Sequence, residues 1–243
     1  PLMDVLPIVG SAQYGFINPP ELELDFTGLA NLADFKSIKD SIRKTILDII
    51  TGMMVLPNRM MSKLVESQNF FTAYQPPLGV ARITLQSGRG FQEEKRSLRQ
   101  KDIPDVYCII QLGASEPWTT QVIKNSTSPV WKNESADYLL FDYDQVVTIQ
   151  ALDKDDGTLN RDNVIGSTQV TVGEILLSGK TKEVELQEDD NKGTGAFFTL
   201  HCDLLSLIPT IEHVQEVSAR TYCGLLTILL SQAYDLPKTE PKE

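Results

Sequence analysis

Asp153 and Asp155 are two aspartates that stand two residues apart at the end of an apolar, strand-like run. Side chains at alternate positions of an extended segment point to the same side, so both carboxylates can face one ion. Calcium is a hard cation that takes about six to eight oxygen ligands, and its sites gather carboxylates on loops. Asp is also common at turns and strand ends for purely structural reasons. The pair therefore predicts either a calcium site or an acidic turn.

A second charged segment, residues 95–101, is basic. Its cationic residues are Lys95, Arg96, Arg99 and Lys101. Charge runs of this kind are usually solvated surface loops, which is the simpler interpretation. Near an anionic membrane, however, each Lys or Arg contributes about 1 kcal/mol of attraction to the lipid head groups. We therefore hypothesise that this segment contacts anionic lipid.

The composition excludes several other kinds of function. The net charge of −11 argues against nucleic acid as a partner, because phosphate binding needs a surplus of Lys and Arg. His201 and His213 lie in unrelated segments, and the sequence has no Gly-x-Ser-x-Gly elbow, phosphate-binding glycine loop or zinc-ligand spacing. We predict that the chain is not an enzyme. Cys108 and Cys202 stand in apolar strand-like runs and are predicted to be buried thiols.

The elements that would position these residues divide the chain by pattern. We expect folded segments at 1–66, 78–205 and 223–243, with linkers at 67–77 and 206–222. No uninterrupted apolar stretch approaches the roughly 18 residues of a membrane-spanning helix. Because the chain begins at Pro1 without a start methionine, we expect it to be a fragment of a longer protein.

The first segment contains a strict alternation of apolar and acidic residues. Leu22, Leu24 and Phe26 alternate with Glu21, Glu23 and Asp25. An alternation of this length predicts a half-exposed strand with the three apolar side chains on one side.

From Ser37 the pattern changes to helical spacing. Ser37 and Asp40 are a capping pair, and Gly52 and Pro57 are expected to end the helix. The apolar face of this helix consists of Ile38, Ile42, Ile46, Ile49 and Ile50. Such a face is usually packed in a core, but it could instead form the wall of a lipid-holding groove. The pattern alone does not separate these two interpretations.

Residues 78–205 are typical of an all-β sandwich, with short strands separated by turn residues. The predicted strands are 79–86, 106–112, 119–123, 136–141, 146–153, 164–172, 181–186 and 195–204, with a helical turn at 173–177. Trp131 is expected in the core and Trp118 at a partly exposed position. Residues 224–230 repeat the pattern of residues 79–85, which predicts the start of a second sandwich of the same kind at 223–243.

Four motifs in order make the middle of the chain resemble a C2 domain. They are Pro-Asp-Val-Tyr at 104–107, Ser-Pro-Val-Trp-Lys-Asn-Glu at 128–134, Asp-Lys-Asp at 153–155 and Val-Ile-Gly at 164–166. The resemblance implies an eight-stranded antiparallel C2 β-sandwich that docks on phospholipid membranes.

The first segment resembles the C-terminal part of an SMP domain, an α+β tubular lipid-binding fold found in extended synaptotagmins and tricalbins. The match rests on Pro-Glu-Leu-Glu-Leu-Asp-Phe at 20–26, the isoleucine-rich helix, and Val-Leu-Pro-Asn-Arg at 55–59. The resemblance implies a tether at an endoplasmic reticulum contact site that carries glycerolipids, with an SMP-mediated homodimer as a possible assembly. Leu22, Leu24, Phe26, Ile42 and Ile46 would then contact lipid.

The resemblance also implies calcium ligands. It carries these roles to Asp105 in the first loop and to Asp153 and Asp155 in the third. Asp162 could supply the last ligand, although Asn163 directly precedes the Val-Ile-Gly motif. The second aspartate of the first loop has no clean counterpart, and the residues that could replace it are Glu93, Glu94 and Asp102. Since a missing carboxylate weakens binding and basic neighbours oppose it, we expect at most one weakly bound calcium ion.

Three functions remain open on these grounds. The first is lipid transfer and membrane tethering. The second is a calcium sensor or exocytosis protein that carries no lipid, and the third is a regulatory C2 domain beside an enzyme. The Val-Leu-Pro motif at 55–57 after an isoleucine-rich helix favours the first.

Overall fold

The computed structural model describes residues 6, 8–25, 35–66, 75–92, 94–97, 100–132, 134–154, 162–188 and 191–207. The chain forms two compact units, Pro1–Leu207 and Ile208–Glu243, and the described residues belong to the first. Residues 67–74 of the predicted first linker lie outside the described residues. So do residues 208–222 of the second linker and the predicted second sandwich at 223–243.

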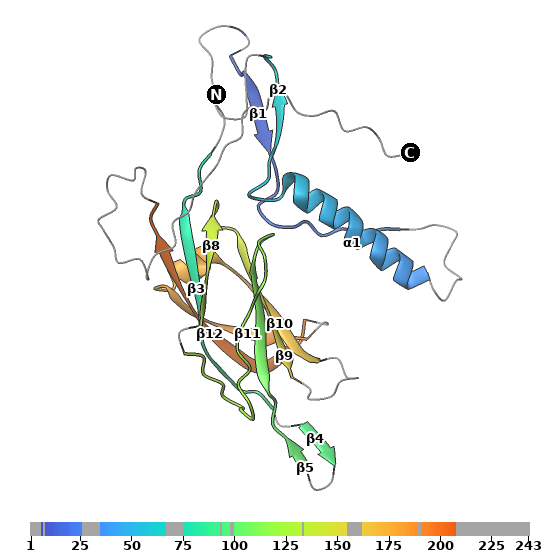
Figure 1. Ribbon diagram of the computed structural model, residues 1–243, viewed down its shortest axis with the longest axis vertical. Helices are drawn as coiled ribbons and strands as arrows, with labels where there is room; N and C mark the ends of the chain where they lie inside the picture. Colours follow the sequence, from blue (N-terminus) through green and yellow to red (C-terminus); the bar gives the residue numbers. More distant parts are fainter. Residues whose placement is uncertain are drawn as a thin grey trace, which may run out of the picture. The chain divides into compact units, whose positions relative to one another are not determined.

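Eight antiparallel strands form the main body, in the order β7-β6-β9-β10-β11-β12-β3-β8 (Figure 1). Between β10 and β11 the register contains the single pair Ser167–Gln187, and the sheet divides there into two layers of four strands. The predicted eight-stranded C2 sandwich is therefore confirmed. The strand bounds are β3 Gly79–Arg89, β6 Val106–Leu112, β7 Trp118–Thr119, β8 Ser135–Leu140, β9 Val146–Asp153, β10 Asn163–Thr171, β11 Thr181–Gln187 and β12 Gly193–Leu205.

Most of these strands agree with the predicted ranges to within a few residues. β7 is much shorter than predicted, because Ile123 makes only an isolated bridge to Val106. The helical turn is confirmed as α3, Val172–Leu177. Its first turn is capped by Thr171, whose hydroxyl accepts a hydrogen bond from the backbone N–H of Glu174 at 3.1 Å.

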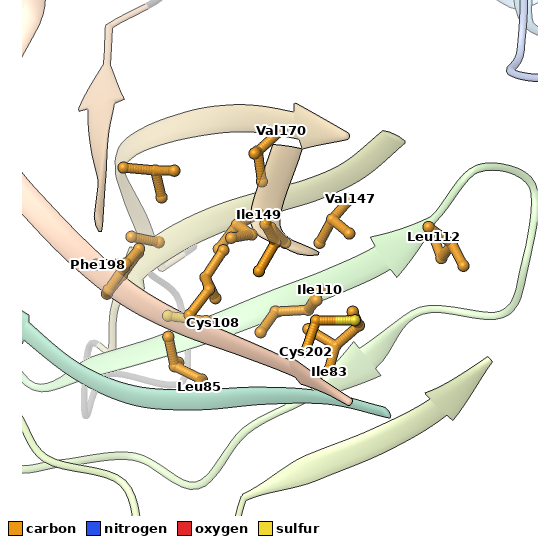
Figure 2. Packing of buried hydrophobic residues seen from close by; sticks show 14 of the residues in the cluster. Ile83, Leu85, Cys108, Ile110, Leu112, Val147, Ile149, Val170, Phe198 and Cys202 are labelled. Atoms are coloured by element: carbon orange, nitrogen blue, oxygen red, sulfur yellow. The ribbon is translucent and has the colours of Figure 1, made fainter. Parts of the chain in front are cut away.

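The core lies between the two layers and follows the alternation of each strand. In β6 every second residue is buried, starting at Val106, and β3, β9 and β12 contribute in the same way (Figure 2). Trp131 is buried as predicted, and its Nε1 donates a hydrogen bond to the carbonyl of Gln121 at 2.9 Å. Trp118 is half-buried, again as predicted.

Cys108 and Cys202 are fully buried free thiols in this core, which confirms the prediction made for them (Figure 2). Burial raises the pKa of the Cys108 thiol well above its usual range. The pKa of Cys202 rises to about 11, first through burial and then through the negative charge of Asp203. Both sulfurs act as small apolar groups that fill the interior.

The isoleucine-rich helix is present as α1, Phe35–Met54. It starts before Ser37, so Ser37 and Asp40 lie inside its first turns and the predicted capping pair is wrong. Gly52 is likewise within the helix, which ends at Met54. Among the described residues, no helix is both long and apolar enough to cross a membrane.

The paired strands of the first segment are not the predicted ones. β1, Ser11–Tyr14, pairs antiparallel with β2, Met60–Lys63. Residues 21–25 form no strand, although Leu22 and Leu24 are half-buried while the acidic residues between them are exposed. The alternation therefore describes burial correctly but not hydrogen bonding. Phe26 lies outside the described residues.

Candidate functional site

Three neighbouring strands bring the predicted calcium ligands to one end of the sandwich. Asp105 directly precedes β6, Asp153 ends β9, and Asp162 directly precedes β10. In the register, Asp153 stands opposite Val106 on one side and Asn163 on the other. Asp155 lies outside the described residues. Strand pairing thus gathers aspartates that are far apart in the sequence.

Backbone groups hold two of these carboxylates in place. The N–H of Asp105 donates to Asp153 Oδ1 at 2.7 Å, and the N–H of Asn125 donates to Asp105 Oδ1 at 2.7 Å. The N–H of Lys154 donates to the carbonyl of Asp105 at 2.9 Å. Such bonds are typical of carboxylates that shape loops.

The third carboxylate, Asp162, is held by side chains. Its Oδ2 accepts hydrogen bonds from the Tyr107 hydroxyl at 2.7 Å and from Lys154 Nζ at 3.0 Å. Lys154 Nζ also lies 5.9 Å from the centroid of the Tyr107 ring. Burial and the bond to Asp162 raise the pKa of Tyr107 to about 12, so its hydroxyl remains a donor at neutral pH. An ammonium group therefore already balances part of the negative charge here.

The three described carboxylates do not form a calcium coordination shell by themselves. Within the described parts of the chain, no group of three or more Asp, Glu, His or Cys side chains is close enough to hold a metal ion. The roles of Lys154 and Tyr107 were not predicted. Both residues stand in the motifs that carry the C2 resemblance. The position of Lys154 between two aspartates could have indicated from the sequence that it forms an ion pair with a nearby carboxylate.

The basic segment beside this end is a hairpin, so its prediction as a loop is wrong. β4, Glu94–Ser97, pairs antiparallel with β5, Gln100–Asp102, and Glu94 stands opposite Asp102 (Figure 1). Lys95 and Arg96 are in β4, and Lys101 is in β5. Glu93 and Arg99 lie outside the described residues. Since Asp102 is three residues from Asp105, the cationic and acidic segments occupy the same end of the sandwich.

The second candidate surface is the isoleucine face of α1. Ile38, Ile49 and Met53 are 52%, 55% and 50% exposed, and Ile42 is 38% exposed. Ile46 is half-buried. A helix face packed in a core would be almost completely buried. Within the part of the chain that the structure describes, this apolar face is therefore exposed over much of its area.

Two family models match the parts of the chain that carry these two surfaces. The family model described as the Synaptotagmin-like mitochondrial-lipid-binding domain, the SMP domain, matches residues 1–65, and the model described as the C2 domain matches residues 79–187. Extended synaptotagmin-1 of Pongo abelii is 28% identical over 98% of this chain. Extended synaptotagmin-2 of Homo sapiens is 30% identical over 89% of it. The chain is an extended-synaptotagmin-like SMP–C2 segment.

This extended-synaptotagmin-like segment covers 22% and 23% of the lengths of those two relatives. A solved structure of two C2 domains of extended synaptotagmin 2 with calcium bound is 25% identical. It matches 57% of this chain and 50% of its own chain, with a TM-score of 0.45. In the extended-synaptotagmin-like segment, α1 lies in the SMP match and the acidic strand ends lie in the C2 match.

Proposed function

We propose that this chain belongs to a non-catalytic membrane tether that carries glycerolipid on the apolar face of α1. Its C2 sandwich attaches to anionic membranes through the end that carries the hairpin β4–β5. We propose domains at 1–66 and 78–205, the start of a second C2 domain at 223–243, and action at endoplasmic reticulum contact sites. The observation that carries the proposal is the exposed isoleucine face within the SMP match. Exposed apolar faces of this kind mark binding sites for apolar partners.

Native mass spectrometry tests the lipid part. We expect glycerolipid to co-purify with the chain, and the double variant Ile42→Asn with Ile46→Asn to lose most of it. Burying a large apolar side chain is worth about 1.5–3 kcal/mol, so each replacement should weaken lipid binding about tenfold or more.

The matched control is Asp40→Asn with Lys44→Asn, because these exposed residues have the same spacing on the opposite face of α1. This control should keep its lipid. Equal lipid in both double variants would contradict the assignment of the isoleucine face. A chain that carries no lipid and is dimeric would show that a second copy covers this face instead.

We further propose that the acidic end binds at most one calcium ion, with a dissociation constant of about 10⁻⁴–10⁻³ M. The support is that Asp105, Asp153 and Asp162 already accept internal hydrogen bonds. Titration calorimetry should show weak binding that disappears when Asp153 and Asp155 are both changed to Asn.

The variant Lys154→Ala serves as a second probe of the same site. It removes the ammonium from Asp162, and calcium affinity should rise by at most about fivefold, since a partly exposed ion pair is worth about 1 kcal/mol or less. Submicromolar binding of two or more ions, lost in the double Asn variant, would overturn the proposal. Absence of calcium binding in every form would leave the aspartates a purely structural role.

A further inference from the structure

The turn between β8 and β9 is held rigid from within. Gln145 is only 2% exposed, and its Oε1 accepts hydrogen bonds from the N–H groups of Phe141 at 2.6 Å and Asp142 at 3.1 Å. The N–H of Gly173, in α3, donates to the carbonyl of Tyr143 at 2.8 Å. Residues 141–146, here called the β8–β9 turn, therefore present backbone groups in fixed positions.

Two of these backbone groups bond to one side chain outside the sandwich. Asn18 Nδ2 donates to the carbonyl of Asp144 at 2.8 Å, and the N–H of Val146 donates to Asn18 Oδ1 at 2.8 Å. A carboxamide offers one donor and one acceptor edge, as a peptide group does. Gly113 lies alongside, where an added Cβ would be 3.7 Å from Asn18 Oδ1. Asn18 thus donates one hydrogen bond to the backbone of the turn and accepts one from it, as the peptide groups of a neighbouring strand would.

Asn18 is itself fixed to the SMP segment. Two residues earlier, the N–H of Phe16 donates to the carbonyl of Met54 at 2.6 Å, and the carbonyl of Phe16 accepts from the N–H of Leu56 at 3.0 Å. These bonds attach residues 16–18 to the C-terminal end of α1. A movement of α1 relative to the sandwich would therefore act directly on Asn18.

A second part of the SMP segment approaches the same turn. The guanidinium carbon of Arg59 lies 5.8 Å from the centroid of the Phe141 ring. Leu56 and Pro57 line a cavity of about 440 Å³ together with residues of the sandwich, including Trp118. The contact with the C2 domain therefore combines the two hydrogen bonds of Asn18, here called the clamp, with a cation–π contact and a shared cavity.

We propose that the β8–β9 turn is a docking surface for the SMP segment of the same chain and that Asn18 is the residue that locks the two together. The clamp lies at the first residue of β9 and Asp153 at its last. With about 3.3 Å per residue, the length of β9 separates the hydrogen bond at Val146 from Asp153 by roughly 23 Å. This docking does not depend on whether the SMP segment carries lipid.

Hydrogen exchange at the Val146 amide tests the clamp in the whole chain. Asn18→Ala should accelerate this exchange by about tenfold or more, since the amide loses its acceptor. Asn58→Ala is the matched control, because Asn58 Nδ2 bonds to the carbonyl of Thr51 within the SMP segment. The control should leave the hydrogen-exchange rate of the Val146 amide unchanged. Equal exchange in the unchanged chain and in Asn18→Ala would overturn the proposal.

A distance measurement gives an independent readout. Spin labels at Lys44→Cys on α1 and Gln169→Cys on β10 occupy exposed positions, and Cys223→Ser leaves Cys108 and Cys202 buried in the core. With Asn18 intact, the distance between the two spin labels should have one narrow distribution. This distribution should broaden in Asn18→Ala but not in Asn58→Ala. A broad distribution with Asn18 intact would show that the two parts move independently and that the proposal is wrong.

Discussion

Replacing Lys95, Arg96, Arg99 and Lys101 with alanine should weaken binding to anionic liposomes by up to about a thousandfold. The reason is that each cation near an anionic surface contributes about 1 kcal/mol, and all four belong to one short segment. Because such attraction is screened, the difference should shrink as the salt concentration rises. Liposome flotation at several contents of anionic lipid and two ionic strengths measures both effects.

A paired control separates position from net charge. Lys95→Ala with Arg96→Ala removes two cations from β4, while Lys180→Ala with Lys182→Ala removes two from the region where β11 begins. That region adjoins α3, at the end of the sandwich opposite Asp153. We expect about a thirtyfold loss of liposome affinity for the first pair and little change for the second. Equal losses would mean that overall charge, not the β4–β5 hairpin, determines binding.

Phe198→Ala should destabilise the sandwich by about 3–5 kcal/mol and lower its melting temperature by about 10 °C or more. Phe198 is completely buried, and its ring lies 5.6 Å from that of Phe91 and 5.8 Å from that of Trp131, centroid to centroid. Alanine would leave a cavity that the neighbouring rings of Phe91 and Trp131 cannot fill. Calorimetry and chemical denaturation of the whole chain measure the loss.

Phe197 provides the matched control on the same strand. It is half-buried and faces the other side of β12, where the guanidinium carbon of Arg89 lies 4.1 Å from its ring centroid. Phe197→Ala should therefore cost clearly less stability than Phe198→Ala, although the two substitutions remove the same atoms. Similar losses for both variants would contradict the inward and outward assignment of β12.

Much of the sandwich could be predicted because its strands are half-buried. In β9 buried apolar residues alternate with the polar Thr148 and Gln150, and this alternation appears directly in the sequence. α3 was predictable for a similar reason, since a short run without alternation separates two strands that have it. Burial was predicted better than pairing, as Leu22 and Leu24 show.

Other features depend on contacts that no local pattern reveals. The hairpin β4–β5 consists largely of charged residues, so it has no apolar side from which a strand could be predicted. Lys154 reaches Asp162 only because β9 and β10 are paired. Asn18 stands directly before two prolines in the sequence, and its side-chain amide bonds to residues more than a hundred positions away. Long-range partners of this kind follow from the assembled fold.

The buried thiols have a consequence for how the protein ages chemically. Oxidants and alkylating reagents react with thiolates that they can reach, and Cys108 and Cys202 are both protonated and enclosed. Modification of either sulfur must therefore wait for the two layers to separate. The rate at which these sulfurs are oxidised measures how often the sandwich opens.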